Sequence, residues 1–205
     1  MRPYQTMSDV PVHAAASVVL LRQDNGNAQV LMGQRGAGAV FMPSKYVFPG
    51  GRVDMSDTAD IETISEACLH RLRQNLSDNP PEVVALIGCA RRELAEETGL
   101  RLTPNATLRF VFRAITPPGG PRRFDARFFL ADAADVPGPL DDFTNAEDEL
   151  SHLHWVSLSE VRRLDLPFIT EIILAELRGI LAGHNQPGVP FFDNSGSTPT
   201  FRRLA

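Results

Sequence analysis

The stretch that decides the fold is RRELAEETGL, residues 91–100. Its glutamates, Glu93, Glu96 and Glu97, are spaced i, i+3 and i+4, so an α-helix of about 3.6 residues per turn carries all three on one face. Carboxylates that lie this close near a helix C-terminus repel one another and the helix dipole. A hard cation such as Mg²⁺ or Mn²⁺ would relieve that repulsion through oxygen ligands. The alternative is a charged helix face in water.

A second motif, FPGG at residues 48–51, follows a short predicted strand at residues 46–48. Two adjacent glycines let backbone amides and carbonyls approach a metal ion or a phosphate closely. A tight turn is the alternative interpretation of the pair, and we expect the strand to stop there.

Taken together, FPGGRVD (residues 48–54) and RRELAEETGL resemble the signature of the Nudix family, G-x5-E-x7-R-E-U-x-E-E-x-G-U, in which U is a bulky aliphatic residue. The second half matches at Arg92, Glu93, Leu94, Glu96, Glu97, Gly99 and Leu100. The first half departs from the signature, because Gly51 lies 41 positions before Arg92 instead of 14. An insertion, assigned to residues 55–80, would explain this spacing. The position eight before Arg92 is Val84, so the first glutamate is absent when counted from Arg92.

The resemblance covers about residues 15–181. The long insertion and TPPGGPRRFDARFFLAD (residues 116–132) are similar to the branch that includes the peroxisomal coenzyme A diphosphatases and their bacterial relatives. It implies a metal-dependent hydrolase that cleaves the diphosphate bond of a nucleoside diphosphate derivative such as coenzyme A or an acyl-CoA. ADP-ribose, NADH and nucleotide sugars are alternative substrates. A Nudix module that senses nucleotides without catalysis is the alternative of another class.

The resemblance also implies roles for individual residues. Glu93, Glu96 and Glu97 would hold Mg²⁺ or Mn²⁺, and the carbonyl of Gly51 would add a ligand. Arg92 would orient a glutamate of the motif. The catalytic set would be Arg92, Glu93, Glu96 and Glu149, with Glu149 as an extra ligand or general base because it lies six residues before Trp155. Glu147 and Asp148 are its rivals.

Substrate contacts are predicted for Arg35, Phe41, Arg123 and Arg127. Arginine suits phosphate recognition, but strand alternation puts Arg123 and Arg127 on one face with Asp125. Phosphate contact and internal ion pairing are therefore equal alternatives for these two arginines. Phe41 could stack on a base, with core packing as the alternative.

Composition narrows the functional class. The 205 residues are 43% hydrophobic and 22% charged, with a formal net charge of −5. These are globular values, and the negative charge disfavours general binding to nucleic acid or anionic membranes. Cys68 and Cys89 lie in no disulfide or zinc pattern, and no apolar run approaches the ~18 residues of a membrane span. We expect a cytoplasmic enzyme that acts on a small-molecule nucleotide, without nucleic-acid or membrane partners. A homodimer stays open, because Nudix enzymes often pair.

The expected fold is α/β or α+β: a Nudix fold with a mixed β-sheet between helices and a helical insertion. One domain would span residues 1–205, with its core at 13–183 and a tail at 184–205 rich in Gly, Pro and Ser. The pattern predicts a hairpin from residues 15–22 and 29–34, strands at 46–48, 108–116, 124–130 and 152–157, and helices at 61–76 (capped by Asp60), from about 80 to 98, and at 167–182. A capping box from Ser157 to Glu160 predicts a further short helix.

Overall fold

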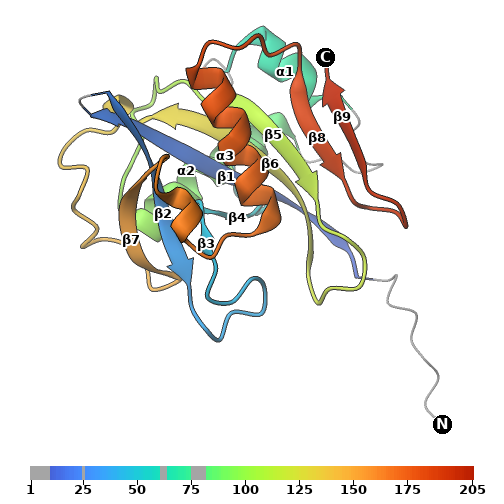
Figure 1. Ribbon diagram of the computed structural model, residues 1–205, viewed down its shortest axis with the longest axis horizontal. Helices are drawn as coiled ribbons and strands as arrows, with labels where there is room; N and C mark the ends of the chain where they lie inside the picture. The colour runs from blue at the N-terminus through green and yellow to red at the C-terminus, as the bar shows by residue number, and fades with distance from the viewer. Residues whose placement is uncertain (1–9, 25, 61–63, 75–81) are drawn as a thin grey trace.

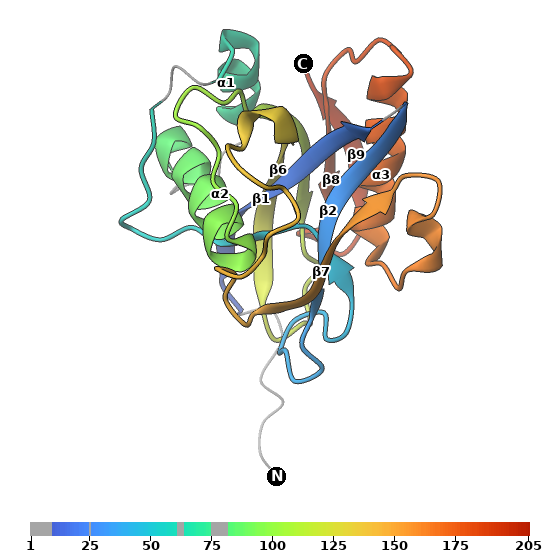
Figure 2. The ribbon, with the colours of Figure 1, turned by 90° about the vertical axis from the view of Figure 1, so that its left-hand side faces the viewer.

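The computed structural model describes residues 10–24, 26–60, 64–74 and 82–205. Within this part the chain builds one mixed sheet with helices on both of its faces (Figures 1 and 2). The predicted fold class, a mixed sheet between helices, is confirmed.

The described residues form a nine-stranded sheet in the order β3-β2-β1-β6-β5-β8-β9, with β4 paired to β1 and β7 paired to β2. The β1/β6 and β5/β8 pairs are parallel, and the other pairs are antiparallel. The strands are β1 Val12–Asp24, β2 Asn27–Arg35, β3 Tyr46–Val47, β4 Gly50–Arg52, β5 Arg109–Ile115, β6 Arg123–Asp132, β7 Leu150–Ser157, β8 Val189–Asp193 and β9 Thr200–Leu204.

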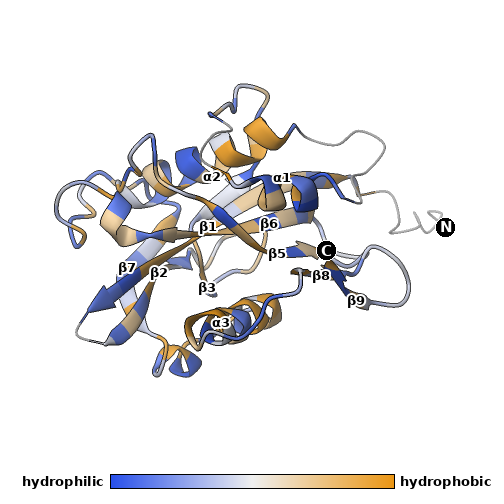
Figure 3. Ribbon diagram, turned by 90° about the horizontal axis from the view of Figure 1, so that it is seen from above, coloured by the Kyte–Doolittle hydropathy of each residue, from blue (hydrophilic) through white to orange (hydrophobic). Residues whose placement is uncertain are grey.

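Three α-helices cover the sheet: α1 Glu66–Leu72, α2 Val83–Thr98 and α3 Phe168–Leu181. Seen from above, α1 and α2 lie on one side of the sheet and α3 on the other (Figure 3). Side chains that alternate along β6 pack against the helices on both faces of the sheet. Phe129 packs in the cluster that contains Leu94 of α2, whereas Phe128 packs against the cluster that contains Ile173 of α3.

The ends and packing of α2 follow from its glycines. Gly99 ends the helix in the left-handed conformation, with φ 76°, which a glycine adopts without steric cost. Gly88 lies against the backbone of Thr58, where a Cβ atom would be only 2.5 Å from the Thr58 nitrogen. This close approach explains a glycine within the helix, and it fixes the segment after β4 along α2.

Several predicted details are wrong. Helix α1 begins at Glu66, and Ser65 rather than Asp60 caps it, because the Ser65 hydroxyl accepts a bond from the Cys68 amide at 3.3 Å. The predicted starts of this helix, at residues 61–63, and its end, at 75–76, fall outside the described residues. Gly50 and Gly51 do not simply stop a strand, since they form β4.

Two further corrections concern the C-terminal third. Only a short 3-10 helix, Val161–Arg163, follows Ser157, and it has no side-chain cap; the Ser157 hydroxyl instead bonds to Asn27 at 2.8 Å. The tail at residues 184–205 forms the hairpin β8–β9, which extends the sheet beside β5. Its Phe191 is 1% exposed and belongs to the core.

Both cysteines, Cys68 and Cys89, are buried free thiols, as predicted. Among the described residues, no helix combines the length and apolar character needed to cross a membrane.

Candidate active site

The glycines of FPGG lie directly against the carboxylates of α2. Strand β4 pairs with β1, which brings Gly50 and Gly51 over the last turns of α2. The Gly50 amide donates a 2.7 Å hydrogen bond to Oε2 of Glu97. A Cβ atom on Gly51 would lie 2.3 Å from Oε1 of Glu93. Only glycine fits at Gly51 without displacing that carboxylate, so two motifs 41 positions apart in sequence form one site.

Arg92 ties this site together. Its Nη1 donates to Oε1 of Glu93 at 2.7 Å and to Oε2 of Glu96 at 2.9 Å. Its Nε and Nη2 bind both oxygens of Asp57, at 2.8 and 3.0 Å, and Nη2 also donates to the carbonyl of Arg52 at 3.1 Å. A planar guanidinium bound on all sides cannot swing, so Arg92 fixes the orientation of the glutamates.

Asp57 is a site residue that the sequence analysis missed. Its side chain is only 3% exposed. Burial disfavours its charge, but the bonds from Arg92 and from the Asp54 amide hold the pKa of Asp57 below its ordinary value. Counting forward from Gly51, Asp57 occupies the position of the first glutamate in the signature. The interpretation that this acid is absent is therefore wrong; an aspartate stands there, and the extra residues follow it.

Glu93 and Glu97, the two inner glutamates, lie where a negative charge is unfavourable. Burial raises the pKa of Glu97 to about 8, and the negative charges of Glu93 and Glu149 add to the effect. Burial likewise raises the pKa of Glu93, against the opposing contact with Arg92. The Glu97 side chain is almost fully buried, and its Oε1 has no hydrogen-bond partner among the described residues.

These features fit a divalent cation beside Glu93 and Glu97. A buried carboxylate oxygen without a partner is costly unless a cation or donor satisfies it. In the described part of the chain, however, no three or more His, Cys, Asp or Glu side chains already form a metal-binding group. Glu96 is turned toward Arg92 and is 40% exposed, and the Gly51 carbonyl accepts a weak 3.5 Å contact from the Cys89 thiol. The acids closest to the glycines are therefore Glu93 and Glu97.

Glu149 joins this centre from the loop before β7. Arg35 holds it, with Nη2 2.9 Å from Oε1 of Glu149, and the Arg35 Nε donates to the Phe41 carbonyl at 3.0 Å. Glu149 lines the same cavity as Glu93, whereas its rivals Glu147 and Asp148 do not. The structure thus brings Glu149, Arg35 and Phe41 together with the two motifs.

An open cavity of about 770 Å³ lies in front of these residues. Its wall includes Gly50, Gly51, Glu93 and Glu149 on the acidic side. Phe41 also lines it and packs edge-on against Phe124, with ring centroids 5.1 Å apart. A cavity of this size accepts a nucleotide-sized ligand.

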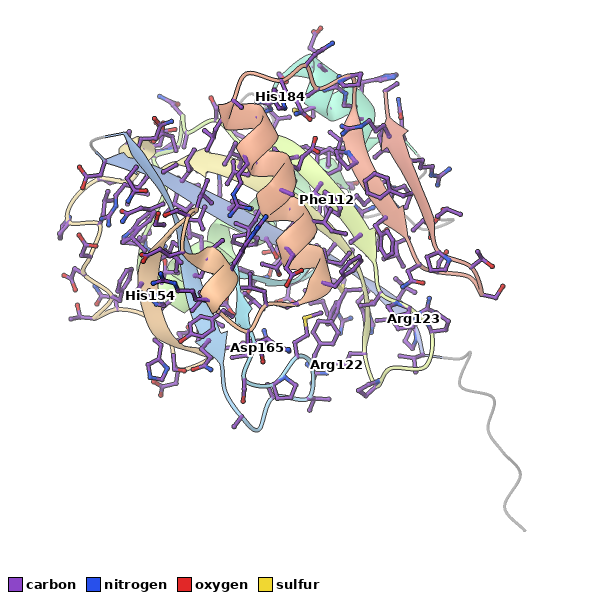
Figure 4. The ribbon with its side chains drawn as sticks, in the orientation of Figure 1. Phe112, Arg122, Arg123, His154, Asp165 and His184 are labelled. Carbon is purple, nitrogen blue, oxygen red and sulfur yellow. The ribbon has the colours of Figure 1, made fainter. Side chains whose placement is uncertain are left out.

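Arg123 and Arg127 do not line the cavity. Arg127 is 1% exposed and pairs with Asp125 at 3.0 Å, while Arg123 donates to the carbonyls of Thr116 and Ser195. The structure therefore favours the ion-pair alternative for Arg127, and it places the Arg123 side chain on backbone carbonyls. Their neighbour Arg122, at the β5–β6 turn in Figure 4, lines the cavity instead.

Arg52 is a second cation that the sequence analysis did not select. It follows Gly51 on β4 and lines the cavity. Within the described residues, the side chains of Arg52 and Arg122 make no hydrogen bond or ion pair. Arg52 stands in a GGR triplet and Arg122 in a polar turn, but only the folded chain places both side chains at the cavity.

Residues 78–177 match the family model of the NUDIX domain. The chain contains a Nudix domain. A Caenorhabditis elegans protein named as a nudix hydrolase is 30% identical over 161 residues, which cover 72% of this chain and 52% of that protein. This chain therefore spans about half the length of that curated relative.

Solved structures show the same Nudix fold. A NUDIX hydrolase from Alicyclobacillus acidocaldarius is 24% identical with a TM-score of 0.56, covering 82% of this chain and 91% of its own. The NUDIX domain of Shewanella oneidensis NrtR, complexed with ADP-ribose, is 16% identical with a TM-score of 0.56, covering 87% and 94%. An Ap4A hydrolase from C. elegans is 18% identical with a TM-score of 0.55, covering 84% and 99%.

Proposed function

We propose that this Nudix domain is a metal-dependent diphosphatase that cleaves a nucleoside diphosphate derivative. The observation that carries the proposal is the contact of Gly50 with Glu97 and of Gly51 with Glu93, at a place where both glycines and Glu93 line an open cavity. Glu97 and Glu93 would hold Mg²⁺ or Mn²⁺, with Glu96 within reach on the same helix face. Such a cation, when bound, neutralises diphosphate oxygens and acidifies a water molecule.

The chain's own residues would prepare the reaction. Arg92 holds Glu93 and Glu96 in fixed orientations, and Asp57 holds Arg92. Because phosphoryl transfer depends mainly on positioning and electrostatics, this rigid set supplies what the reaction needs. Arg52 and Arg122 would bind the outer phosphate or a neighbouring anionic group.

Glu149 is the candidate general base. It is 55% exposed, so water can reach it, and Arg35 holds it at the cavity wall. A carboxylate in this place can accept a proton from the attacking water. Arg35 is then a positioning residue for Glu149 as well as part of the wall.

The substrate proposal is coenzyme A or an acyl-CoA, with ADP-ribose, NADH, nucleotide sugars and dinucleoside polyphosphates as alternatives. The solved relatives support a nucleotide ligand: one binds ADP-ribose and another is an Ap4A hydrolase. The free buried thiols support a cytoplasmic setting for this reaction.

Product-resolved hydrolysis tests the function. Purified protein is incubated with Mg²⁺ or Mn²⁺ and each substrate class, and both phosphate-bearing products are identified. We expect metal-dependent cleavage of one class at the diphosphate bond, and its loss in Glu93→Gln. If the protein binds a nucleotide but cleaves none of them, it is a sensing module and the proposal is wrong.

A further inference from the structure

We propose that a groove floored by alanines leads from the glycine motif to the C-terminal hairpin and takes an extended, mainly uncharged substituent of the substrate. The inference rests on the proposed function, since it concerns the part of a diphosphate compound that lies beyond the scissile bond. It assigns the hairpin β8–β9, which lies outside the matched NUDIX region, to substrate selection.

The strand register defines the groove. Arg52 pairs with Ala15, Ala15 with Ala126, Ala126 with Ala114, and Ala114 with Phe192. All five residues line the cavity. Side chains that pair across neighbouring strands form a row on one face of a sheet. The three consecutive alanines in that row have only methyl side chains, so they leave a trough, which is the proposed groove. Arg52 closes it at one end and Phe192 at the other.

The length of this row suits an extended group. It crosses β4, β1, β6, β5 and β8, and neighbouring strands lie about 4.8 Å apart, so four steps span roughly 19 Å. The diphosphate group itself occupies only the end beside Gly51 and Glu93. A compact ligand cannot reach both ends of the trough at once.

The chemistry of the far end is apolar with isolated neutral polar groups. Phe192 packs edge-on against Phe168, with centroids 6.0 Å apart. Thr170 lines the cavity and is 5% exposed, yet no hydrogen bond of its hydroxyl is found in the described part of the chain. The hydroxyl oxygen is not one of the buried, unpartnered side-chain atoms of the described residues, so it is open to the cavity, where a ligand amide or carbonyl can bond to it. Among the charged lining residues, Arg52 stands at the other end of the row and Glu93 lies against its neighbour Gly51, whereas Arg122 lies at the β5–β6 turn.

The hairpin is held in place for this role. Strand β8 runs parallel to β5, and Arg123 reaches from β6 to the Ser195 carbonyl at 3.2 Å beyond β8. By contrast, no described residue of the insertion, residues 55–60 and 64–74, lines the cavity. The hairpin rather than the insertion therefore forms the selective wall.

A series of ADP alkyl esters tests the groove. The alkyl group has two, six or ten carbons. Affinity is measured by calorimetry with EDTA, and hydrolysis is measured separately with Mn²⁺. The wild type should gain roughly three- to fourfold in affinity for each methylene that the groove buries. In Ala126→Leu, the larger side chain fills the trough. The ratio of the affinity for the ten-carbon ester to that for the two-carbon ester should therefore be at least about tenfold smaller than in the wild type. Ala175→Leu, on the exposed side of α3, is the matched control and should behave as the wild type.

Thr170→Val gives a second readout that does not depend on filling the trough. It should weaken an ester whose chain carries an amide about five- to tenfold relative to the plain alkyl ester, because it removes the hydroxyl that would bond to that amide.

The outcomes separate the two proposals. The groove proposal is wrong if two results occur together, even if the esters are cleaved. The first is that affinity does not rise with chain length in the wild type, or rises equally in Ala126→Leu. The second is that Thr170→Val has no selective effect on the ester with an amide. If Ala126→Leu removes the gain in affinity with chain length, but no ester and no other substrate class is hydrolysed, the result supports the groove and contradicts the diphosphatase.

Discussion

The backbone amide of Gly50 donates a 2.7 Å hydrogen bond to Oε2 of Glu97, while the other oxygen of that carboxylate is buried and has no partner among the residues that the structure describes. One bond from a loop motif thus orients a glutamate on a helix and leaves its second oxygen available. This relationship is the physical reason for assigning a cation to Glu97 and Glu93.

Asp57→Asn should lower both the stability of the protein and its catalytic rate. It removes one of the charges that hold Arg92, so we expect a loss of about 2 kcal/mol in the free energy of unfolding and a lower kcat. Chemical denaturation and steady-state kinetics measure the two effects. Asp54→Asn is the matched control, because Asp54 is 65% exposed and lies 3.9 Å from Arg92; it should cost less than about 0.5 kcal/mol. Equal effects of the two variants would contradict a special role for Asp57.

The stability of the metal-free protein should fall as the pH rises. The pKa of Glu97 is raised to about 8 in the fold, so the folded state holds a proton that the unfolded chain loses near its ordinary pKa. Its contribution is fully present below about pH 4.5 and is lost as the pH rises to about 8. Urea unfolding in EDTA at several pH values measures this, with Glu97→Gln as the comparison. The slope between pH 5 and 8 should be smaller in the variant; identical slopes would contradict the assignment.

Glu149→Gln should reduce kcat by about a hundredfold with a smaller change in KM, because it removes a proton acceptor and keeps the size of the side chain. Asp148→Asn, next to it on the same loop, is the control. Steady-state kinetics of both variants measures kcat and KM. If Asp148→Asn has the larger effect, the base is misassigned.

Leu72→Ala tests whether the insertion is a structural element. Leu72 of α1 is 2% exposed and lies in the core cluster with Leu86 of α2. We expect a loss of about 2–4 kcal/mol in stability and no change in the ratio of kcat/KM between two substrates. A changed ratio without loss of stability would assign substrate selection to the insertion instead of the C-terminal hairpin.

The sequence predicted the elements whose periodicity is strong. The helix ending at Gly99 and the first hairpin follow from local spacing, and the contact of Arg92 with a glutamate of the motif follows from the resemblance. Asp57 was missed because the distance was counted backward from Arg92, across an insertion that does not preserve register. Arg123 and Arg127 face the same side of β6 as Asp125, as alternation indicates, but only tertiary packing shows that this side is the core.

The C-terminal hairpin could not be predicted for a related reason. Gly, Pro and Ser make up seven of the 22 residues at 184–205, and they obscure two short strands. Strand β8 exists because β5 offers a free edge, which is a property of the sheet and not of the segment. The trough it closes depends on the register of five strands, which no local pattern specifies.

The most direct test of the central claim is Mn²⁺ binding followed by electron paramagnetic resonance, with hydrolysis measured on the same samples. Glu97→Gln and Glu93→Gln should each weaken Mn²⁺ binding at least about tenfold and abolish turnover, while the exposed Glu147→Gln should retain both. Retention of wild-type Mn²⁺ affinity in both inner variants would contradict the proposed metal site.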